Sequence, residues 1–240
     1  MRPRFVSRLG VADAVTAVNA GLGFLATAAA AVDPGLAARL ILLAGITDGL
    51  DGVVARAFGS SPVGTYLDSL ADVASFGVAP AALVVAIAAR SGTVSPGLTL
   101  STAVALVVPA LFVVTAVVRL AIYTAYDSGD ATTSGVPTTL AATILSAATL
   151  AGIVTPTVAI VATALFVYLM IAPVTYPDLL ARDALLMGIV HALAVVAPHL
   201  WGRTFPYALL TLGVAYLVFA PWLYWRDETP SLPWAVKGNA

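Results

Sequence analysis

Long apolar segments alternate with short polar or Gly/Pro-containing breaks along the whole chain. A helix that spans a bilayer needs about 20 mainly apolar residues; seven segments approach that length, and one more, 184–197, is shorter. We expect helices at residues 14–32, 36–56, 64–89, 99–123, 136–154, 157–173, 184–197 and 205–224. The pattern therefore predicts an all-α, polytopic membrane bundle, with a six-helix core and two further C-terminal helices.

Turn-forming sequences mark the ends of these segments. Asp33-Pro34-Gly35 follows the first, Gly59-Ser60-Ser61-Pro62 breaks the second, and residues 127–135 are the most polar stretch inside the bundle. Residues 127–134 are either a cover over a site or a plain solvated linker, and we expect the linker. The divisions expected are a basic lead-in at 1–12, a single transmembrane domain at 13–226 and a polar tail at 227–240.

Composition supports a membrane protein and narrows its chemistry. The chain is 60% hydrophobic and 10% charged, whereas about a quarter of the residues in a soluble domain are charged. The net charge of −1 comes without a basic patch, so we expect no nucleic-acid partner. Without cysteine and with only two histidines, any metal must be held by oxygen, which favours Mg²⁺ or Mn²⁺ over zinc.

Four aspartates lie within 25 residues of this apolar chain. The pairs Asp48/Asp51 and Asp68/Asp72 have i, i+3 and i, i+4 spacing, so each pair shares one helix face, and the break between them allows the two faces to oppose. Carboxylates in apolar surroundings need a compensating cation or hydrogen bonds, and Arg56 alone cannot balance four. We therefore expect one or two divalent ions. Helix caps or surface charges would explain one aspartate better than four.

Small residues continue the acidic face of the second helix. Gly52 and Ala55 would allow a ligand to approach the backbone. Arg56, one turn beyond Gly52, is placed to meet a phosphate oxygen or to pair with an aspartate. A metal and an arginine beside a glycine-lined groove suit a diphosphate-bearing substrate.

Basic residues predict the orientation of the bundle. Eight of the eleven Lys and Arg residues fall on the side of the N-terminus and the aspartates when successive segments alternate in direction. By the positive-inside rule that side is cytoplasmic. We expect the membrane to be the cell membrane of a prokaryote. The eight are Arg2, Arg4, Arg8, Arg56, Arg119, Arg182, Arg226 and Lys237, against Arg39, Arg90 and Arg203 outside.

The motif Asp-x2-Asp-Gly-x2-Ala-Arg, followed by Gly-x3-Asp-x3-Asp, resembles the signature of the CDP-alcohol phosphatidyltransferases. The matching residues are Asp48, Asp51, Gly52, Ala55, Arg56, Gly64, Asp68 and Asp72. The resemblance implies a homodimer in which an alcohol displaces CMP from a CDP-linked lipid, making residues 13–226 a catalytic domain. It implies that Asp48, Asp51 and Asp68 ligate the metals, that Asp72 is a ligand or the catalytic base, and that Gly52, Ala55, Arg56, Gly64 and Asp51 bind the CDP diphosphate.

Other stretches resemble the membrane-type phosphatidylserine and archaetidylserine synthases of this family. Residues 67–80 look like their version of the second motif, and 119–124 resemble their Arg-Leu-Ala-Arg-Phe-Asn, with Ile122 and Thr124 departing from it. Residues 13–19 resemble their Asn-x-x-Thr-x-x-Asn, with Asp13 in place of the first Asn. The likeness implies L-serine as acceptor, CDP-diacylglycerol or CDP-archaeol as donor, and acceptor or phosphate contacts from Arg119, Asn19 and Thr16.

Three alternatives remain at this point. The same family also uses glycerol phosphate or inositol phosphate as acceptors. Intramembrane prenyltransferases pair aspartate motifs with Mg²⁺, but their two motifs lie far apart in the chain. An ion-coupled transporter could bind its cation through these acids, although such folds usually show a repeated half with broken helices.

Overall fold

The computed structural model describes residues 9–59, 61–97, 99–127, 132–177, 179 and 181–224. Its helices are α1 Val11–Val32, α2 Pro34–Phe58, α3 Gly64–Asp72, α4 Ala79–Arg90, α5 Leu100–Ile122, α6 Thr138–Ala151, α7 Pro156–Leu169, α8 Ala181–Val196 and α9 Thr204–Leu223. Two π-helical segments extend them, η1 Val73–Val78 and η2 Tyr123–Asp127. Residues 1–8 of the predicted lead-in and the whole predicted tail lie outside the described residues.

The predicted turn signals do end the helices. Asp33 caps α2, because its Oδ1 accepts a hydrogen bond from the Gly35 amide at 2.8 Å and Pro34 occupies the first helical position. Gly59 ends the same helix with a φ of 85°, which a residue with a Cβ adopts only at a cost. Thr99 caps α5 through the Thr102 amide.

The bundle is a polytopic all-α membrane protein, as the apolar pattern predicts. Among the described residues, four helical stretches are long and apolar enough to cross a bilayer: Val11–Val32, Gly64–Arg90, Leu100–Tyr126 and Thr204–Leu223. The 14-residue α6 is shorter, about 21 Å at 1.5 Å per residue, less than the roughly 30 Å of a hydrocarbon core. Most of its side chains are buried. It is therefore an internal helix of the bundle.

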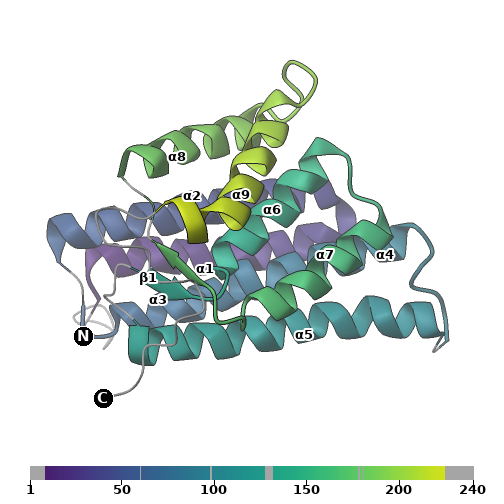
Figure 1. Cartoon of the computed structure of the whole chain (residues 1–240), viewed down its shortest axis with the longest axis horizontal. Coiled ribbons are helices and arrows are strands. Elements are labelled where there is room, and N and C mark those ends of the chain that lie inside the picture. The colour runs from purple at the N-terminus through teal and green to yellow at the C-terminus, as the bar shows by residue number, and fades with distance from the viewer. Residues whose placement is uncertain are drawn as a thin grey trace, which may run out of the picture.

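Long helices running side by side define two ends of the molecule (Figure 1). α1 packs against α2 and against the continuous α3–η1–α4 helix, α5 packs against α4 and α7, and α6 lies between α2 and α9. α8 packs on α2 and α9. One end of the bundle therefore carries the start of α1, the end of α2, the start of α3 and the end of α5.

A small two-stranded sheet lies at this same end. β1 Thr132–Ser134 pairs antiparallel with β2 Thr175–Pro177, and Thr133 lies opposite Tyr176. β1 contacts η2, and β2 contacts α9. The expectation that residues 127–134 are plain linker is therefore wrong for 132–134, which form β1. The pairing provides hydrogen bonds for backbone groups at a boundary where unpaired ones would be costly.

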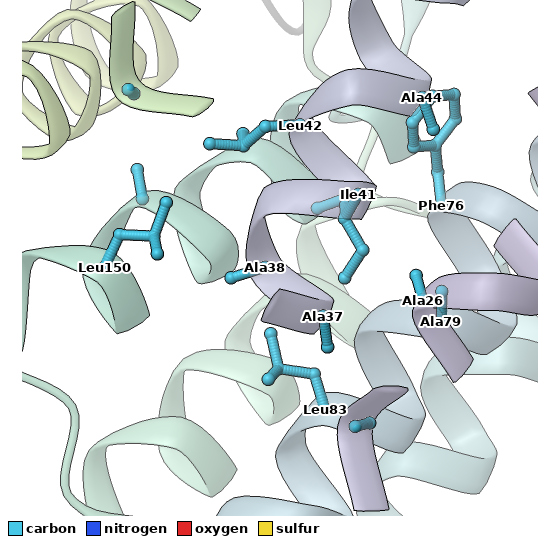
Figure 2. Packing of buried hydrophobic residues seen from close by; sticks show 14 of the residues in the cluster. Ala26, Ala37, Ala38, Ile41, Leu42, Ala44, Phe76, Ala79, Leu83 and Leu150 are labelled. Atoms are coloured by element: carbon cyan, nitrogen blue, oxygen red, sulfur yellow. The ribbon is translucent and has the colours of Figure 1, made fainter. Parts of the chain in front are cut away.

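Alanines dominate the core where α2 meets α1, α4 and α6 (Figure 2). Ile41, Leu42, Phe76, Leu83 and Leu150 pack among Ala26, Ala37, Ala38, Ala44 and Ala79. Small side chains allow helix backbones to approach closely, and close packing drives helix association in lipid, where the hydrophobic effect between helices is weak.

Gly23 marks the closest approach of α1 to the η1 segment. A Cβ added there would lie 2.7 Å from backbone atoms of Ala74 and Ser75, which cannot move aside as a flexible side chain can. We expect Gly23→Ala to destabilise the fold by about 1–3 kcal/mol. Thermal unfolding in detergent would measure the loss. Gly21→Ala is the matched control, since nothing lies within 4 Å of a Cβ at that position of the same helix. Equal melting temperatures for the two variants would contradict the prediction.

Candidate active site

Three of the four aspartates meet between α2 and α3. Asp48 lies in the second half of α2, and Asp68 and Asp72 lie on α3. One carboxylate oxygen from each of these three residues lies within 4.8 Å of the others. The chain reversal between Phe58 and Gly64 allows this, because it turns the two acidic helix faces toward each other.

Asp51 lies beside this group and is hydrogen-bonded to a residue of α1. Its Oδ2 accepts a hydrogen bond from the Thr16 hydroxyl at 2.7 Å, and both side chains are buried. Asp51 is nevertheless close enough for its charge to act on Asp48, Asp68 and Asp72. Four carboxylates therefore share one small region.

Asn19 lies beneath Asp72, one turn beyond Thr16 on α1. Its amide Nδ2 is 3.5 Å from Asp72 Oδ1, and its backbone carbonyl accepts a hydrogen bond from the Ser75 hydroxyl at 2.8 Å. The Asn19 side chain is fully buried, and its Oδ1 has no hydrogen-bond partner among the described residues. Thr16 and Asn19 thus contact the aspartates directly. Their predicted contact with acceptor or phosphate remains a prediction.

The three carboxylates fit a hard divalent cation. Oxygen ligands of one Mg²⁺ at 2.0–2.1 Å lie at most about 4 Å apart, and Mn²⁺ accepts the same oxygen donors. A spread of 4.8 Å therefore requires only small side-chain rotations. Asp48 and Asp68 are partly exposed and Asp72 is buried, so the group is open on one side. The donor set is all oxygen, as the sequence predicts.

Three of the predicted diphosphate-binding residues, Gly52, Ala55 and Arg56, lie near the end of α2, while Gly64 begins α3 and Asp51 is buried. Arg56 is exposed, and its guanidinium folds back over Gly52, with Nη1 3.6 Å from where a Cβ of that residue would lie. Within the described residues Arg56 forms no ion pair with an aspartate. Gly52, Ala55 and Gly64 are all partly exposed. The guanidinium is thus available to a ligand.

Arg119 is buried near the end of α5, at the same end of the bundle. Its Nη2 donates a hydrogen bond to the Thr133 hydroxyl on β1 at 2.8 Å. Ser69, the neighbour of Asp68, is hydrogen-bonded to Thr124 on η2. The sequence offers no signal for these contacts, because the strand is three residues long and each pair is distant in the chain.

A family comparison agrees with this arrangement. The model of the CDP-alcohol phosphatidyltransferase family matches residues 9–176. The chain belongs to this family. Its enzymes are membrane-embedded, act on a CDP-linked lipid and generally use a divalent metal. Membership makes this protein an enzyme and decides against the transporter alternative.

Two characterised relatives have names that specify an acceptor. The chain is 31% identical over 179 residues to archaetidylserine synthase of Methanothermobacter thermautotrophicus, an alignment covering 72% of each protein. It is 54% identical over 54 residues to CDP-diacylglycerol–serine O-phosphatidyltransferase of Mycobacterium leprae, covering 22% of this chain and 18% of that one. The second similarity is thus local.

Proposed function

We propose that this phosphatidyltransferase joins L-serine to CDP-diacylglycerol or CDP-archaeol, giving phosphatidylserine or archaetidylserine and CMP. The observation that carries the reaction is the meeting of Asp48, Asp68 and Asp72 in a chain of this family. The acceptor is supported by the similarity to archaetidylserine synthase over most of both chains.

In the proposed reaction the serine hydroxyl oxygen attacks the lipid-side phosphorus. A new P–O bond to serine forms, the P–O bond to the CMP phosphate breaks, and CMP leaves. Asp72 takes the hydroxyl proton, and Asn19 holds the Asp72 carboxylate. Asp48, Asp51 and Asp68 would hold one or two Mg²⁺ or Mn²⁺ ions, which neutralise charge on the diphosphate when bound. Arg56, over Gly52, would bind a diphosphate oxygen.

Arg119 is our candidate for binding the serine carboxylate. We expect Arg119→Gln to raise the KM for serine about tenfold or more, because charge-assisted hydrogen bonds contribute roughly 1.5–3 kcal/mol, and to leave the KM for the CDP-lipid unchanged. Thr133→Val is the control, since it removes the bond at 2.8 Å to Arg119 and leaves the charge. An equal rise for both variants would show that Arg119 only supports β1.

The acceptor itself is tested by CMP release from purified protein. CDP-diacylglycerol and CDP-archaeol are each supplied with Mn²⁺. Serine, glycerol phosphate and inositol phosphate are then added in separate reactions. We expect serine alone to support rapid release, and the better CDP-lipid identifies the natural tails. Release with a phosphorylated alcohol but not with serine would overturn the assignment and retain the family chemistry.

We also propose that the aspartate end faces the cytoplasm and that the enzyme is a homodimer. Arg56 lies at the aspartate end, whereas Arg39 and Arg90 bond to backbone carbonyls of Val195 and Val32 at the other. The chain has no cysteine, so a maleimide reacts only with a cysteine that is introduced by mutation. In intact cells an impermeant maleimide should label Ser91→Cys and spare Ala57→Cys. The reverse labelling pattern would contradict the proposed orientation.

The proposed homodimer is tested separately, by crosslinking between two copies of the chain.

A further inference from the structure

A polar cavity lies at the end of the bundle opposite the aspartates. It has a volume of about 290 Å³ and is formed where the start of α2, the end of α6 and the α8–α9 connection meet. Its charged and polar side chains come from Asp33, Arg39, Thr149, His199 and Arg203. We call it the Arg39–Arg203 pocket. None of these residues belongs to the catalytic machinery proposed above.

The two guanidinium groups retain free donors toward this pocket. Arg39 Nε donates to the Val195 carbonyl at 2.7 Å, and its two Nη groups form no hydrogen bond with the residues that the structure describes, which leaves them for a ligand. Arg203 packs on Gly152 so closely that a Cβ there would be 1.5 Å from Nη1. No hydrogen bond joins the Arg203 guanidinium to another residue of the described ranges. These contacts thus place the guanidinium groups of Arg39 and Arg203 in one cavity.

Charge in the pocket is not balanced by the protein. Asp33 is the single acidic residue in its lining, and its Oδ1 already accepts a bond from the Gly35 amide. Two arginines against one aspartate leave one net positive charge. A monoanion would neutralise it. Guanidinium groups match phosphate oxygens particularly well, and a phosphodiester carries a single negative charge.

The surroundings indicate a lipid as the source of that phosphodiester. Exposed apolar residues surround the pocket at the ends of the helices: Val32 is 77% exposed, Leu36 43% and Trp201 76%. Exposed Trp is typical of the membrane–water boundary. The volume lies near the lower limit of about 300–1,000 Å³ for small-molecule sites, which suits a headgroup whose tails remain in the bilayer.

We propose that the Arg39–Arg203 pocket binds the phosphodiester headgroup of an anionic phospholipid at the membrane boundary opposite the active site. The purely structural explanation is that Arg39 and Arg203 only cover the C-terminal ends of α8 and α6. That explanation predicts a stability effect without lipid selectivity. The two readings therefore differ in a measurable way.

The test uses the full chain purified in detergent, with lipid binding followed by native mass spectrometry. We expect phosphatidylglycerol to bind more tightly than zwitterionic phosphatidylcholine, and Arg203→Gln to weaken phosphatidylglycerol binding about tenfold. Arg90→Gln is the control, because Arg90 is another arginine at this end of the bundle, bonded to the Val32 backbone carbonyl, and does not line the pocket. CMP release in detergent should be unchanged in Arg203→Gln, which separates this site from the active site.

Three outcomes would overturn the proposal. The first is equal loss of phosphatidylglycerol in Arg203→Gln and Arg90→Gln, and the second is equal binding of the two lipids by the unaltered chain. The third is binding of inorganic phosphate or glycerol phosphate as tightly as the lipid, which would identify a free anion as the ligand. If Arg203→Gln does not fold, Arg203→Lys keeps the charge but not the bidentate geometry, and it should still weaken phosphatidylglycerol binding.

Discussion

Replacing Asp72 with asparagine is expected to lower CMP release by about 10²–10⁴-fold, the range typical of a lost general base. Asp72 is buried, lies with Asp48 and Asp68 in a group whose oxygens are within 4.8 Å, and faces the amide of Asn19. Asparagine has the same shape but neither the charge nor the basicity of the carboxylate. The change should therefore affect the chemistry and leave the helices in place.

Asp33→Asn is the matched control for this prediction. Asp33 lies at the opposite end of the bundle and caps α2, and asparagine caps a helix about as well as aspartate. We expect its CMP release to equal that of the unaltered chain. Activity of Asp72→Asn within about tenfold of the unaltered enzyme would contradict a role as base.

A Mn²⁺ titration of Asp72→Asn separates the two roles that the family resemblance allows. A residue that only ligates metal can be compensated by excess ion, since mass action refills a weakened site. A residue that accepts the hydroxyl proton cannot, because saturation with metal supplies no base. We expect the rate at saturating Mn²⁺ to remain low. Recovery would assign Asp72 to metal binding alone.

The helices were predictable because their ends depend on local signals. Residues 33–35 and 59–62 contain the caps and glycines that end α1 and α2, and the observed α2 bounds of Pro34–Phe58 differ by two residues from the expected 36–56. The π-helical segment η1 was not predicted. It adds a residue per turn directly after Asp72, where α1 approaches at Gly23. This close contact joins segments about 50 residues apart in the chain, which no local pattern reveals.

The site was predictable only where its members share a helix. The i, i+3 and i, i+4 spacings were sufficient to expect Asp48, Asp68 and Asp72 to face one another. The bonds from Thr16 to Asp51 and from Asn19 to Asp72 join residues 35 and 53 positions apart. They depend on how α1 is rotated against α2 and α3, which no spacing within one helix reveals. The same holds for Arg119 and Thr133, which meet because β1 pairs with β2.

Removal of divalent metal is expected to abolish CMP release and to lower the melting temperature of the protein. Asp48, Asp68 and Asp72 repel one another when no cation lies between their carboxylates. An ion that binds only the folded protein stabilises it by about 2.7 kcal/mol at a hundredfold excess over its Kd. Thermal unfolding after EDTA dialysis, followed by addition of Mn²⁺ or Mg²⁺, measures this stabilisation independently of activity.

Asp68→Asn makes that prediction specific to the site, because it removes one of the three repelling charges and one ligand together. Without metal the variant should therefore unfold at a higher temperature than the unaltered chain, and Mn²⁺ should raise its melting temperature much less. Asp33→Asn, outside the group, should keep the full Mn²⁺ response. The prediction fails if Mn²⁺ leaves the melting temperature of the unaltered chain unchanged. It also fails if Mn²⁺ raises the melting temperature of Asp68→Asn as much as that of the unaltered chain. Either result would mean that these carboxylates are not the metal site. A higher melting temperature without metal, together with a smaller rise on adding Mn²⁺, identifies a lost ligand. A merely damaged fold would instead be less stable both with and without the ion.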